Sequence, residues 1–290
     1  QSLARMLELE NAPGGMRGMM WIEIPSVRAN GAPAWFSPFF RMVLPQSCVP
    51  ALPKGGFLCE EMGLGKTIEV LGLVLSNPPP ANWVKDGDPV GTTCVSPSEH
   101  AFNKTPDGGL AGGLRNAPAT AFRSTATLVV CAVSLVGQWI DEARSKLDTV
   151  NGLRIHMYPG QKRIRDPERL ANDYDLVVTT YQTIASDRGK HGLNHPTAQV
   201  EWYRIVLDEA HMAKSAQTAQ SKACHELRAA RRWACTGTPM GIDINDLHGQ
   251  LKFLGAYPCQ TRTLFEAWFR NPLSRSGRMM GGSPTLAIEL

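Results

Sequence analysis

From residue 55 onward, short apolar runs alternate with longer amphipathic stretches. The apolar runs, which we expect to be strands, are residues 56–59, 127–133, 153–158, 174–179, 203–207 and 233–235. The stretches with helical spacing are residues 66–75, 135–147, 215–230 and 245–254. Continuous apolar strands separated by helices are typical of a parallel sheet covered on both faces. We therefore predict an α/β fold with a mostly parallel central sheet, whose ligands bind at the edge where the strands end.

The pattern is different in the first 54 residues and in one internal segment. Residues 2–10 have helical spacing, whereas residues 11–54 carry many Gly and Pro residues and predict an irregular segment packed on the domain. Residues 77–126 contain few large apolar side chains and cannot offset their own ordering entropy, so we expect a disordered surface insertion there. The chain thus divides into residues 1–54, a core domain at 55–258 and a terminal segment at 259–290.

Composition narrows the function only slightly. The net charge of +4 permits contact with nucleic acid but does not argue for it. The seven cysteines form no Cys-x-x-Cys pair, so the sequence shows no zinc framework. We find no secretory signal and no apolar run of bilayer length, and we expect no membrane partner. Because the chain begins with Gln1 and stops at Leu290 without an evident terminator, we expect it to be a fragment.

A glycine-rich segment lies between a predicted strand and a predicted helix. It reads Gly63-Leu64-Gly65-Lys66-Thr67. Glycines let backbone N–H groups point at phosphate oxygens, and the helix N-terminus adds its dipole. Lys66 would then reach the terminal phosphates, and the Thr67 hydroxyl would bind Mg²⁺. The first glycine of the strict phosphate-loop pattern is replaced by Glu60, and an ordinary turn at a helix start is the alternative.

Two carboxylates follow the apolar run at 203–207. Asp208 is placed to hold Mg²⁺, and Glu209 to orient and deprotonate an attacking water. Acidic residues after a strand are often only a solvated loop start. Two acids with His211, downstream of a phosphate loop, favour the functional interpretation.

A third candidate, Thr236-Gly237-Thr238-Pro239, follows the apolar run at 233–235. Its hydroxyl groups could sense a γ-phosphate, although an ordinary turn is the alternative interpretation.

Together these segments resemble motifs I, II and III of the superfamily-two helicases, and most closely those of the Swi/Snf-type ATPases. Residues 60–67 read Glu-Glu-Met-Gly-Leu-Gly-Lys-Thr where that family has Asp-Glu-Met-Gly-Leu-Gly-Lys-Thr. Residues 127–147 are similar to motif Ia and residues 174–181 to motif Ib. The resemblance implies a P-loop, RecA-like, three-layer domain. Residues 55–258 would be the first ATP-binding lobe, and residues 259–290 would begin the segment that leads to a second lobe.

The resemblance also implies ligands and site residues. ATP and Mg²⁺ would be bound, with Lys66, Asp208 and Glu209 as catalytic residues and Thr67 and Asp208 as metal ligands. The nucleotide-binding residues would be Gly63, Leu64, Gly65, Lys66, Thr67, Asp208, His211, Thr236, Gly237 and Thr238. The contacts to DNA would be Ser134, Gln138, Thr180, Tyr181 and Lys214. The implied partners are double-stranded DNA, nucleosomes and the second lobe, in the nucleus.

We therefore predict an ATP hydrolase lobe that drives translocation on duplex DNA in chromatin remodelling or DNA repair, with hydrolysis requiring the second lobe. The chain looks most like the repair translocases with an embedded RING finger, although no RING cysteines occur here. It departs from the family at Gly241-Ile242, where Gln-Asn is usual. One alternative is an RNA helicase lobe, which usually has Ser-Ala-Thr as its third motif and a Gly-Ser-Gly-Lys-Thr loop. The other is an ATP-binding interaction module without turnover.

Overall fold

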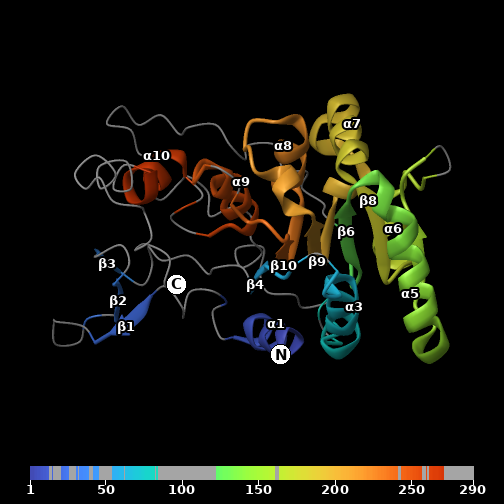
Figure 1. Ribbon diagram of the computed structural model, residues 1–290, viewed down its shortest axis with the longest axis horizontal. Coiled ribbons are helices and arrows are strands. Elements are labelled where there is room, and N and C mark those ends of the chain that lie inside the picture. The colour runs from blue at the N-terminus through green and yellow to red at the C-terminus, as the bar shows by residue number, and fades with distance from the viewer. Residues whose placement is uncertain are drawn as a thin grey trace.

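Seven strands form the central sheet of this computed structural model (Figure 1). The structure describes residues 1–12, 15, 21–25, 31, 33–38, 42–45, 54–61, 63–81, 83, 122–160, 163–240, 243–256, 259 and 261–270. The strands are β4 (Lys54–Leu58), β5 (Phe122–Arg123), β6 (Thr127–Cys131), β7 (Ile155–Met157), β8 (Leu176–Thr180), β9 (Val200–Asp208) and β10 (Arg228–Cys235). Their order is β4-β10-β9-β6-β8-β7, with β5 beside β9. Every pairing in this sheet is parallel, which confirms the predicted α/β fold.

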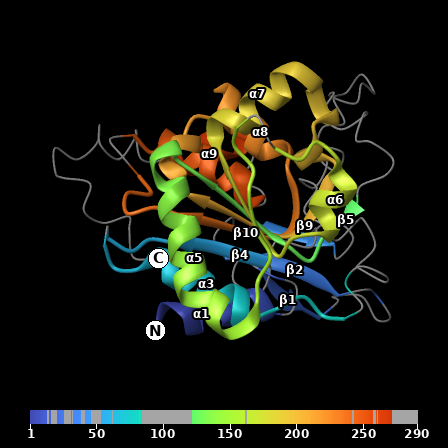
Figure 2. The ribbon, with the colours of Figure 1, turned by 90° about the vertical axis from the view of Figure 1, so that its right-hand side faces the viewer.

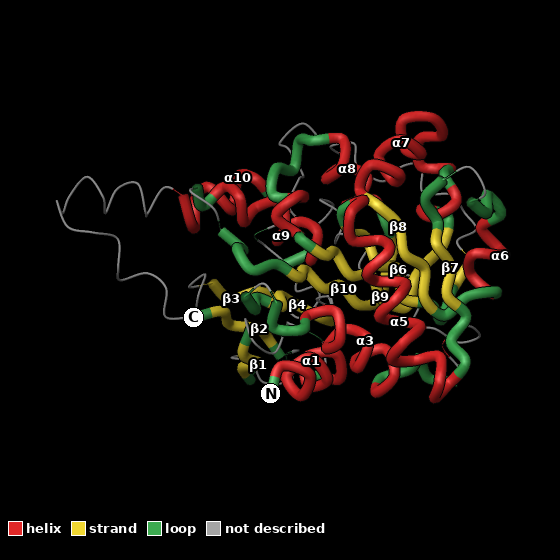
Figure 3. Tube along the Cα trace, turned by 45° about the vertical axis from the view of Figure 1, so that its right-hand side comes forward, coloured by secondary structure: helices red, strands yellow, loops and turns green. Residues whose placement is uncertain are grey.

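Helices cover both faces of the sheet and so make three layers (Figures 2 and 3). One face packs against α1 (Ser2–Asn11), α3 (Lys66–Ser76) and α5 (Val136–Asn151). The other packs against α6 (Pro167–Asn172), α7 (Tyr181–His191), α8 (Ala219–Glu226) and α9 (Asn245–Leu254). Strand β6 is apolar throughout because its side chains enter both cores. Val129 and Cys131 enter the first core, and Leu128 and Val130 enter the second. No described helix is both long and apolar enough to span a bilayer.

Side-chain caps and glycines set the helix ends. Asp166, Thr180 and Thr218 each accept a backbone N–H in the first turn of α6, α7 and α8. Helix α9 ends at Gly255, which has the left-handed conformation that favours glycine. Within α9, Gly249 lets the helix approach the loop after β9, because a Cβ there would lie 2.3 Å from the Lys214 carbonyl oxygen. The site loop and α9 are thus held together by backbone contact.

Shorter elements complete the described chain. The 3₁₀ turns are η3 (Val133–Leu135), η4 (Gly192–Asn194), η5 (Pro196–Ala198) and η6 (Ala210–Ala213). After α9 come α10 (Arg262–Phe265) and the π-helical turn η7 (Glu266–Arg270).

Two sequence predictions about the fold are wrong. Residues 11–54 are not irregular throughout, because β1 (Ile22–Ile24), β2 (Ala34–Ser37) and β3 (Met42–Pro45) form an antiparallel sheet. Trp35 and Leu44 are buried in this sheet. The alternation of inward and outward side chains in such short strands is too brief to be recognised among the glycines and prolines. The helix expected over 215–230 ends at Glu226, since residues 228–230 already pair in β10.

The expected insertion at 77–126 lies largely outside the described residues. Its ends are ordered against the core. Trp83 is buried and donates its indole N–H to the carbonyl oxygen of Ser124, and β5 pairs with β9.

A buried ion pair joins α1 to the sheet. Both oxygens of Glu10, on α1, accept N–H groups from Arg204 of β9 at 2.6 Å, and both side chains are at most 1% exposed. The same carboxylate accepts the indole N–H of Trp233 at 2.8 Å and the amide of Asn77, at the end of α3, at 2.7 Å. Arg231 of β10 lies 3.4 Å away. One carboxylate therefore connects α1 and α3 with strands β9 and β10, near the amino ends of the neighbouring strands β4 and β6.

We predict that Glu10→Gln lowers the free energy of unfolding by about 3–5 kcal/mol at neutral pH, because it leaves the charge of Arg204 buried and uncompensated. Burial by itself raises the pKa of Glu10, but the hydrogen bond and charge of Arg204 and the Trp233 N–H outweigh it and lower that pKa. A carboxylate with a lowered folded-state pKa stabilises the fold above its unfolded pKa, about 4.3, and loses that contribution as the pH falls through the folded value. The difference between wild type and variant should therefore be largest near pH 7 and shrink under acid.

Urea unfolding at several pH values measures both effects. Glu8→Gln is the control, since Glu8 is 66% exposed and pairs only with Arg5 on the same helix. Equal losses in the two variants would contradict the role given to Glu10.

Candidate functional site

Three segments predicted to carry the chemistry meet at one edge of the sheet. Leu58 at the end of β4 pairs in register with Cys235 of β10, and Cys235 pairs with Asp208 of β9. The glycine-rich loop begins at Gly63, soon after Leu58, Glu209 follows Asp208, and the Thr-Gly-Thr-Pro turn follows Cys235. The segments that carry Lys66 and Thr236 are far apart in sequence but meet at the same edge of the sheet.

The glycine-rich loop has the geometry that an anion needs. Gly63 and Gly65 have φ of 86° and 90°, which turns the backbone into the first turn of α3. The first N–H groups of a helix have no partner within it and attract negative charge. The ammonium group of Lys66 donates to the carbonyl oxygens of Glu60 at 2.8 Å and Glu61 at 3.1 Å. A flexible cation beside open N–H donors fits a phosphate group, which would replace the two carbonyl oxygens as its partner.

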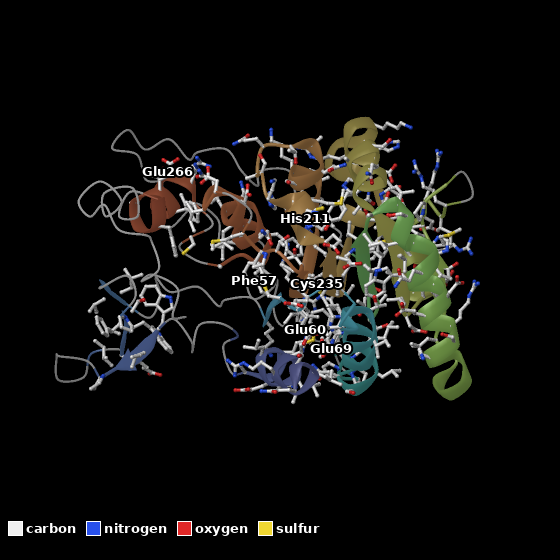
Figure 4. The ribbon with its side chains drawn as sticks, viewed as in Figure 1. Phe57, Glu60, Glu69, His211, Cys235 and Glu266 are labelled. Carbon is white, nitrogen blue, oxygen red and sulfur yellow. The ribbon has the colours of Figure 1, made fainter. Side chains whose placement is uncertain are left out.

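Acidic side chains flank this loop on the side away from α9. Figure 4 shows Glu60 and Glu69 close together between β4, α1 and α3. The Ser2 hydroxyl donates to Glu60 Oε1. Burial, followed by the neighbouring Glu60, raises the pKa of Glu69. Helix α1 therefore contacts the segment that carries the loop.

Asp208 is held firmly at the carboxyl end of β9. Its side chain is 7% exposed. Oδ1 accepts the N–H of Glu209 at 3.0 Å, and Oδ2 accepts the indole N–H of Trp139 at 2.8 Å. Burial raises the pKa of Asp208, the Trp139 hydrogen bond opposes this rise, and the charge of Glu209 adds to it. Each oxygen keeps a lone pair, so the carboxylate fits a divalent cation.

A cation at Asp208 would need further oxygen ligands. The described residues contain no group of three or more His, Cys, Asp or Glu side chains that could hold a metal. Mg²⁺ suits such a site, because it is usually bound by one or two protein oxygens together with phosphate oxygens and water. Thr67, in the first turn of α3, is the second protein oxygen that the sequence predicts.

Glu209 has an unusual backbone conformation. Among the described residues it is the one non-glycine residue with positive φ, at 50°. Its Oε2 lies 3.2 Å from Nδ1 of His211, on the 3₁₀ turn η6. A left-handed conformation disfavours any residue with a Cβ and is common at functional sites. The Glu209 carboxylate thus lies beside His211.

The Thr-Gly-Thr-Pro turn is built by its own polar groups. Thr236 is buried, its N–H donates to the Leu58 carbonyl oxygen at 3.0 Å, and its hydroxyl accepts the Thr238 N–H at 3.1 Å. The Gln250 amide of α9 donates to the Pro239 carbonyl oxygen at 2.6 Å. The hydroxyl of Thr236 thus closes the turn, while Thr238 is exposed. Gly241 and Ile242, where the sequence departs from the family, lie outside the described residues.

The predicted DNA contacts divide into exposed and buried side chains. Ser134, Gln138 and Lys214 are exposed. The Gln138 amide donates a hydrogen bond to Glu142, and the Lys214 ammonium group lies 3.4 Å from the Asp246 carboxylate. Thr180 is 2% exposed, and its hydroxyl caps α7.

Tyr181 is fully buried, and its hydroxyl donates to the Asp208 carbonyl oxygen at 2.8 Å. The side chains of Thr180 and Tyr181 are therefore committed to the interior, unlike those of Ser134, Gln138 and Lys214.

Two features of the site were missed from the sequence. Trp139 and Tyr181 both hydrogen-bond to Asp208 and approach it from opposite faces of the sheet. The sequence does mark both positions, since Gln138-Trp139 and Thr180-Tyr181 stand in the stretches similar to motifs Ia and Ib. Nothing in the sequence shows that their polar atoms point to the same residue.

The chain is similar to several known proteins. A model of the SNF2-related domain matches residues 2–283. Transcription termination factor 2 of Drosophila melanogaster is 34% identical, over 76% of this chain and 20% of the relative. DNA repair protein RAD5B of Arabidopsis thaliana is 34% identical, over 71% of this chain and 15% of the relative. DNA repair protein rad8 of Schizosaccharomyces pombe is 30% identical, over 76% and 18%.

The chain thus spans about a fifth or less of these relatives. Among solved structures, the Sulfolobus solfataricus SWI2/SNF2 ATPase core in complex with dsDNA has a TM-score of 0.50 and 23% identity. That match covers 77% of this chain and 36% of the other, and it supports the fold.

The backbone of Glu209 generates a test that is independent of any ligand. Glu209→Gly and Glu209→Ala both remove the carboxylate, but only glycine adopts a positive φ without cost. We predict that the glycine variant is the more stable of the two by about 1 kcal/mol, because the left-handed conformation costs roughly 1–2 kcal/mol for residues with a Cβ and the flexibility of glycine in the unfolded chain offsets part of this gain. Chemical denaturation of both variants measures the difference. An alanine variant that is as stable as the glycine variant would show that residue 209 is not strained.

Proposed function

Because this chain belongs to the SNF2-related family, we propose that it forms the first ATP-binding lobe of a DNA-dependent ATPase that translocates on duplex DNA in DNA repair or chromatin remodelling. One observation carries the proposal. The register of β4, β10 and β9 brings the loop that bears Lys66 next to Asp208 and Glu209. A cation, a metal-binding carboxylate and a candidate base at one edge of a parallel sheet are the parts that phosphoryl transfer needs.

Nucleotide binding is the first step. Lys66 would leave the carbonyl oxygens of Glu60 and Glu61 for the terminal phosphates, while N–H groups at the start of α3 hold the phosphate chain. Thr67 and Asp208 would hold Mg²⁺, with water and phosphate oxygens as the other ligands. When bound, this ion neutralises charge on the β- and γ-phosphates.

Hydrolysis is the second step. Glu209 would orient a water molecule in line with the γ-phosphorus and take its proton, while the bond to the leaving oxygen of ADP breaks. Nδ1 of His211 lies 3.2 Å from the Glu209 carboxylate. The left-handed backbone of Glu209 determines where that carboxylate points.

DNA would bind along the same edge of the sheet. Ser134, Gln138 and Lys214 are exposed there and suit phosphate oxygens, which carry no sequence information. A translocating enzyme needs this sequence-independent contact. Double-stranded DNA, alone or on nucleosomes, is therefore the proposed partner, and the nucleus the proposed location.

A second lobe would complete the site. The charge that spreads over the γ-phosphate in the transition state calls for an arginine finger, which is worth about three to five powers of ten in rate. In the Swi/Snf-type ATPases that the sequence resembles, this arginine comes from the second lobe. Closure of two lobes around the nucleotide would also exclude water and align the attack.

We predict that Lys66→Ala abolishes most of the affinity for a non-hydrolysable ATP analogue while the fold is retained. Among the described residues its ammonium group donates to two carbonyl oxygens of its own loop, and Lys66 belongs to neither core, so its loss leaves packing intact. Calorimetric titration and the thermal unfolding midpoint are the two measurements. Lys222→Ala, an exposed lysine on α8, serves as the control. An unchanged dissociation constant would rule out the proposed role of Lys66.

We also predict that a polypeptide of residues 1–290 binds nucleotide but hydrolyses it near the background rate, with no response to duplex DNA. Phosphate release is measured with and without duplex DNA, and with RNA as a comparison. A DNA-dependent rise in this polypeptide that Glu209→Gln abolishes would show that a second lobe is not needed. Stimulation by RNA rather than DNA would favour an RNA helicase lobe instead.

A further inference from the structure

Asp208 is held by two aromatic side chains that come from opposite faces of the sheet. The indole N–H of Trp139 donates to Oδ2 of Asp208, and the hydroxyl of Tyr181 donates to its carbonyl oxygen, both at 2.8 Å. Trp139 packs in the core beneath α3 and α5, whereas Tyr181 packs in the core beneath α7 and α8. The side chain and the main chain of Asp208 are thus each fixed by a separate layer.

Trp139 and Trp233 differ from Trp202 and Trp83 because each donates its indole N–H to a carboxylate, Trp139 to Asp208 and Trp233 to Glu10. A buried indole N–H needs a partner, and a backbone carbonyl oxygen is enough. Trp202 donates to the Thr197 carbonyl oxygen and Trp83 to that of Ser124. Trp139 donates to an acid at the candidate metal site, although that acid is itself almost fully buried. The indole N–H of Trp139 therefore orients the carboxylate at the candidate metal site, as that of Trp233 orients the carboxylate paired with Arg204.

We propose that Trp139 and Tyr181 are positioning residues that set the direction of the Asp208 carboxylate for a divalent cation. The proposal rests on the nucleotide site described above. Partners that orient a metal ligand typically change metal affinity 10- to 100-fold when they are removed. Each aromatic group would act through Asp208, which its polar atom contacts.

Trp139 also connects the site to the proposed DNA contacts, whereas Tyr181 connects it to the start of α7. Trp139 follows Gln138 on α5, one turn after the exposed Ser134, and Tyr181 begins α7 directly after its cap Thr180. A shift of either helix start would move a hydrogen-bond donor of Asp208. This physical link joins the segments similar to motifs Ia and Ib to the metal ligand.

The test compares Trp139→Phe with Trp202→Phe in the 290-residue chain. Both remove a buried indole N–H, but only the first affects Asp208. Calorimetry at fixed ADP, titrated with Mg²⁺, gives the Mg²⁺ concentration for half-maximal nucleotide binding. We expect Trp139→Phe to raise that concentration about 10- to 100-fold, with ADP affinity in the absence of Mg²⁺ unchanged. Trp202→Phe should leave both values as in the wild type.

Tyr181→Phe and Tyr158→Phe form the second matched pair. Tyr158 is also fully buried, but its hydroxyl donates to Asp187. We expect Tyr181→Phe to raise the half-maximal Mg²⁺ concentration several-fold, less than Trp139→Phe does, because it frees the main chain of Asp208 rather than its carboxylate. Tyr158→Phe should not change the Mg²⁺ dependence.

Each outcome decides the question. Equal Mg²⁺ dependence in wild type and Trp139→Phe, or equal shifts in the members of a matched pair, would overturn the positioning role. If Trp139→Phe does not fold, incorporation of benzothienylalanine at residue 139 keeps the shape of the indole and removes only the N–H, and it should give the same shift. Failure of the wild type to bind ADP with any Mg²⁺ dependence would instead refute the proposed function.

Discussion

The buried pairing of Glu10 with Arg204 is the constraint around which the domain is arranged. Arg204 lies in the central strand β9, where both neighbours and both covering layers exclude water. A guanidinium group cannot lose its charge there, so a carboxylate must be brought to it. The chain supplies that carboxylate from its first helix, and the same two oxygens also accept hydrogen bonds from the Asn77 amide and the Trp233 indole. A buried pair of this kind adds little net stability compared with apolar packing, but it strongly disfavours any arrangement that separates the partners.

The parallel sheet converts this fixed packing into a site. Because all its strands run in one direction, every loop that follows a strand lies along the same edge, however far apart the segments are in sequence. The glycine-rich loop, Asp208 and the turn at Thr236 come together for that reason alone. What the sheet does not set is the direction of each side chain. Direction comes from local devices, such as the hydrogen bonds of Asp208 and the left-handed backbone of Glu209.

The sequence predicts the strands of the sheet and the motifs that follow them well, because both depend on local periodicity. The helix over Asn245–Leu254 agrees at both ends, and each predicted strand from 56–59 onward is present. It fails where a signal is weak or non-local. Residues 228–230 read as helix because their alanines and arginines suit either state, and pairing with β9 decides between them. The contact between Glu10 and Arg204 spans 194 positions in the sequence, and no local pattern around either residue predicts it. The burial of Tyr181 escaped prediction for the same reason, since its partner is a main-chain atom.

The ion-pair network and the chemical site lie at opposite ends of the same strands, near Thr127 and beside Cys131 in β6. Inherited variants of this domain should therefore fall into two populations in a living cell. Changes around Glu10 and Arg204 would act on the amount of protein, because partly unfolded chains are removed by quality control. Changes around Lys66 and Asp208 would leave abundance normal and remove the proposed ATPase activity. An inactive but abundant copy could still occupy the proposed binding partners, so variants of the second kind are the ones expected to interfere with a healthy allele.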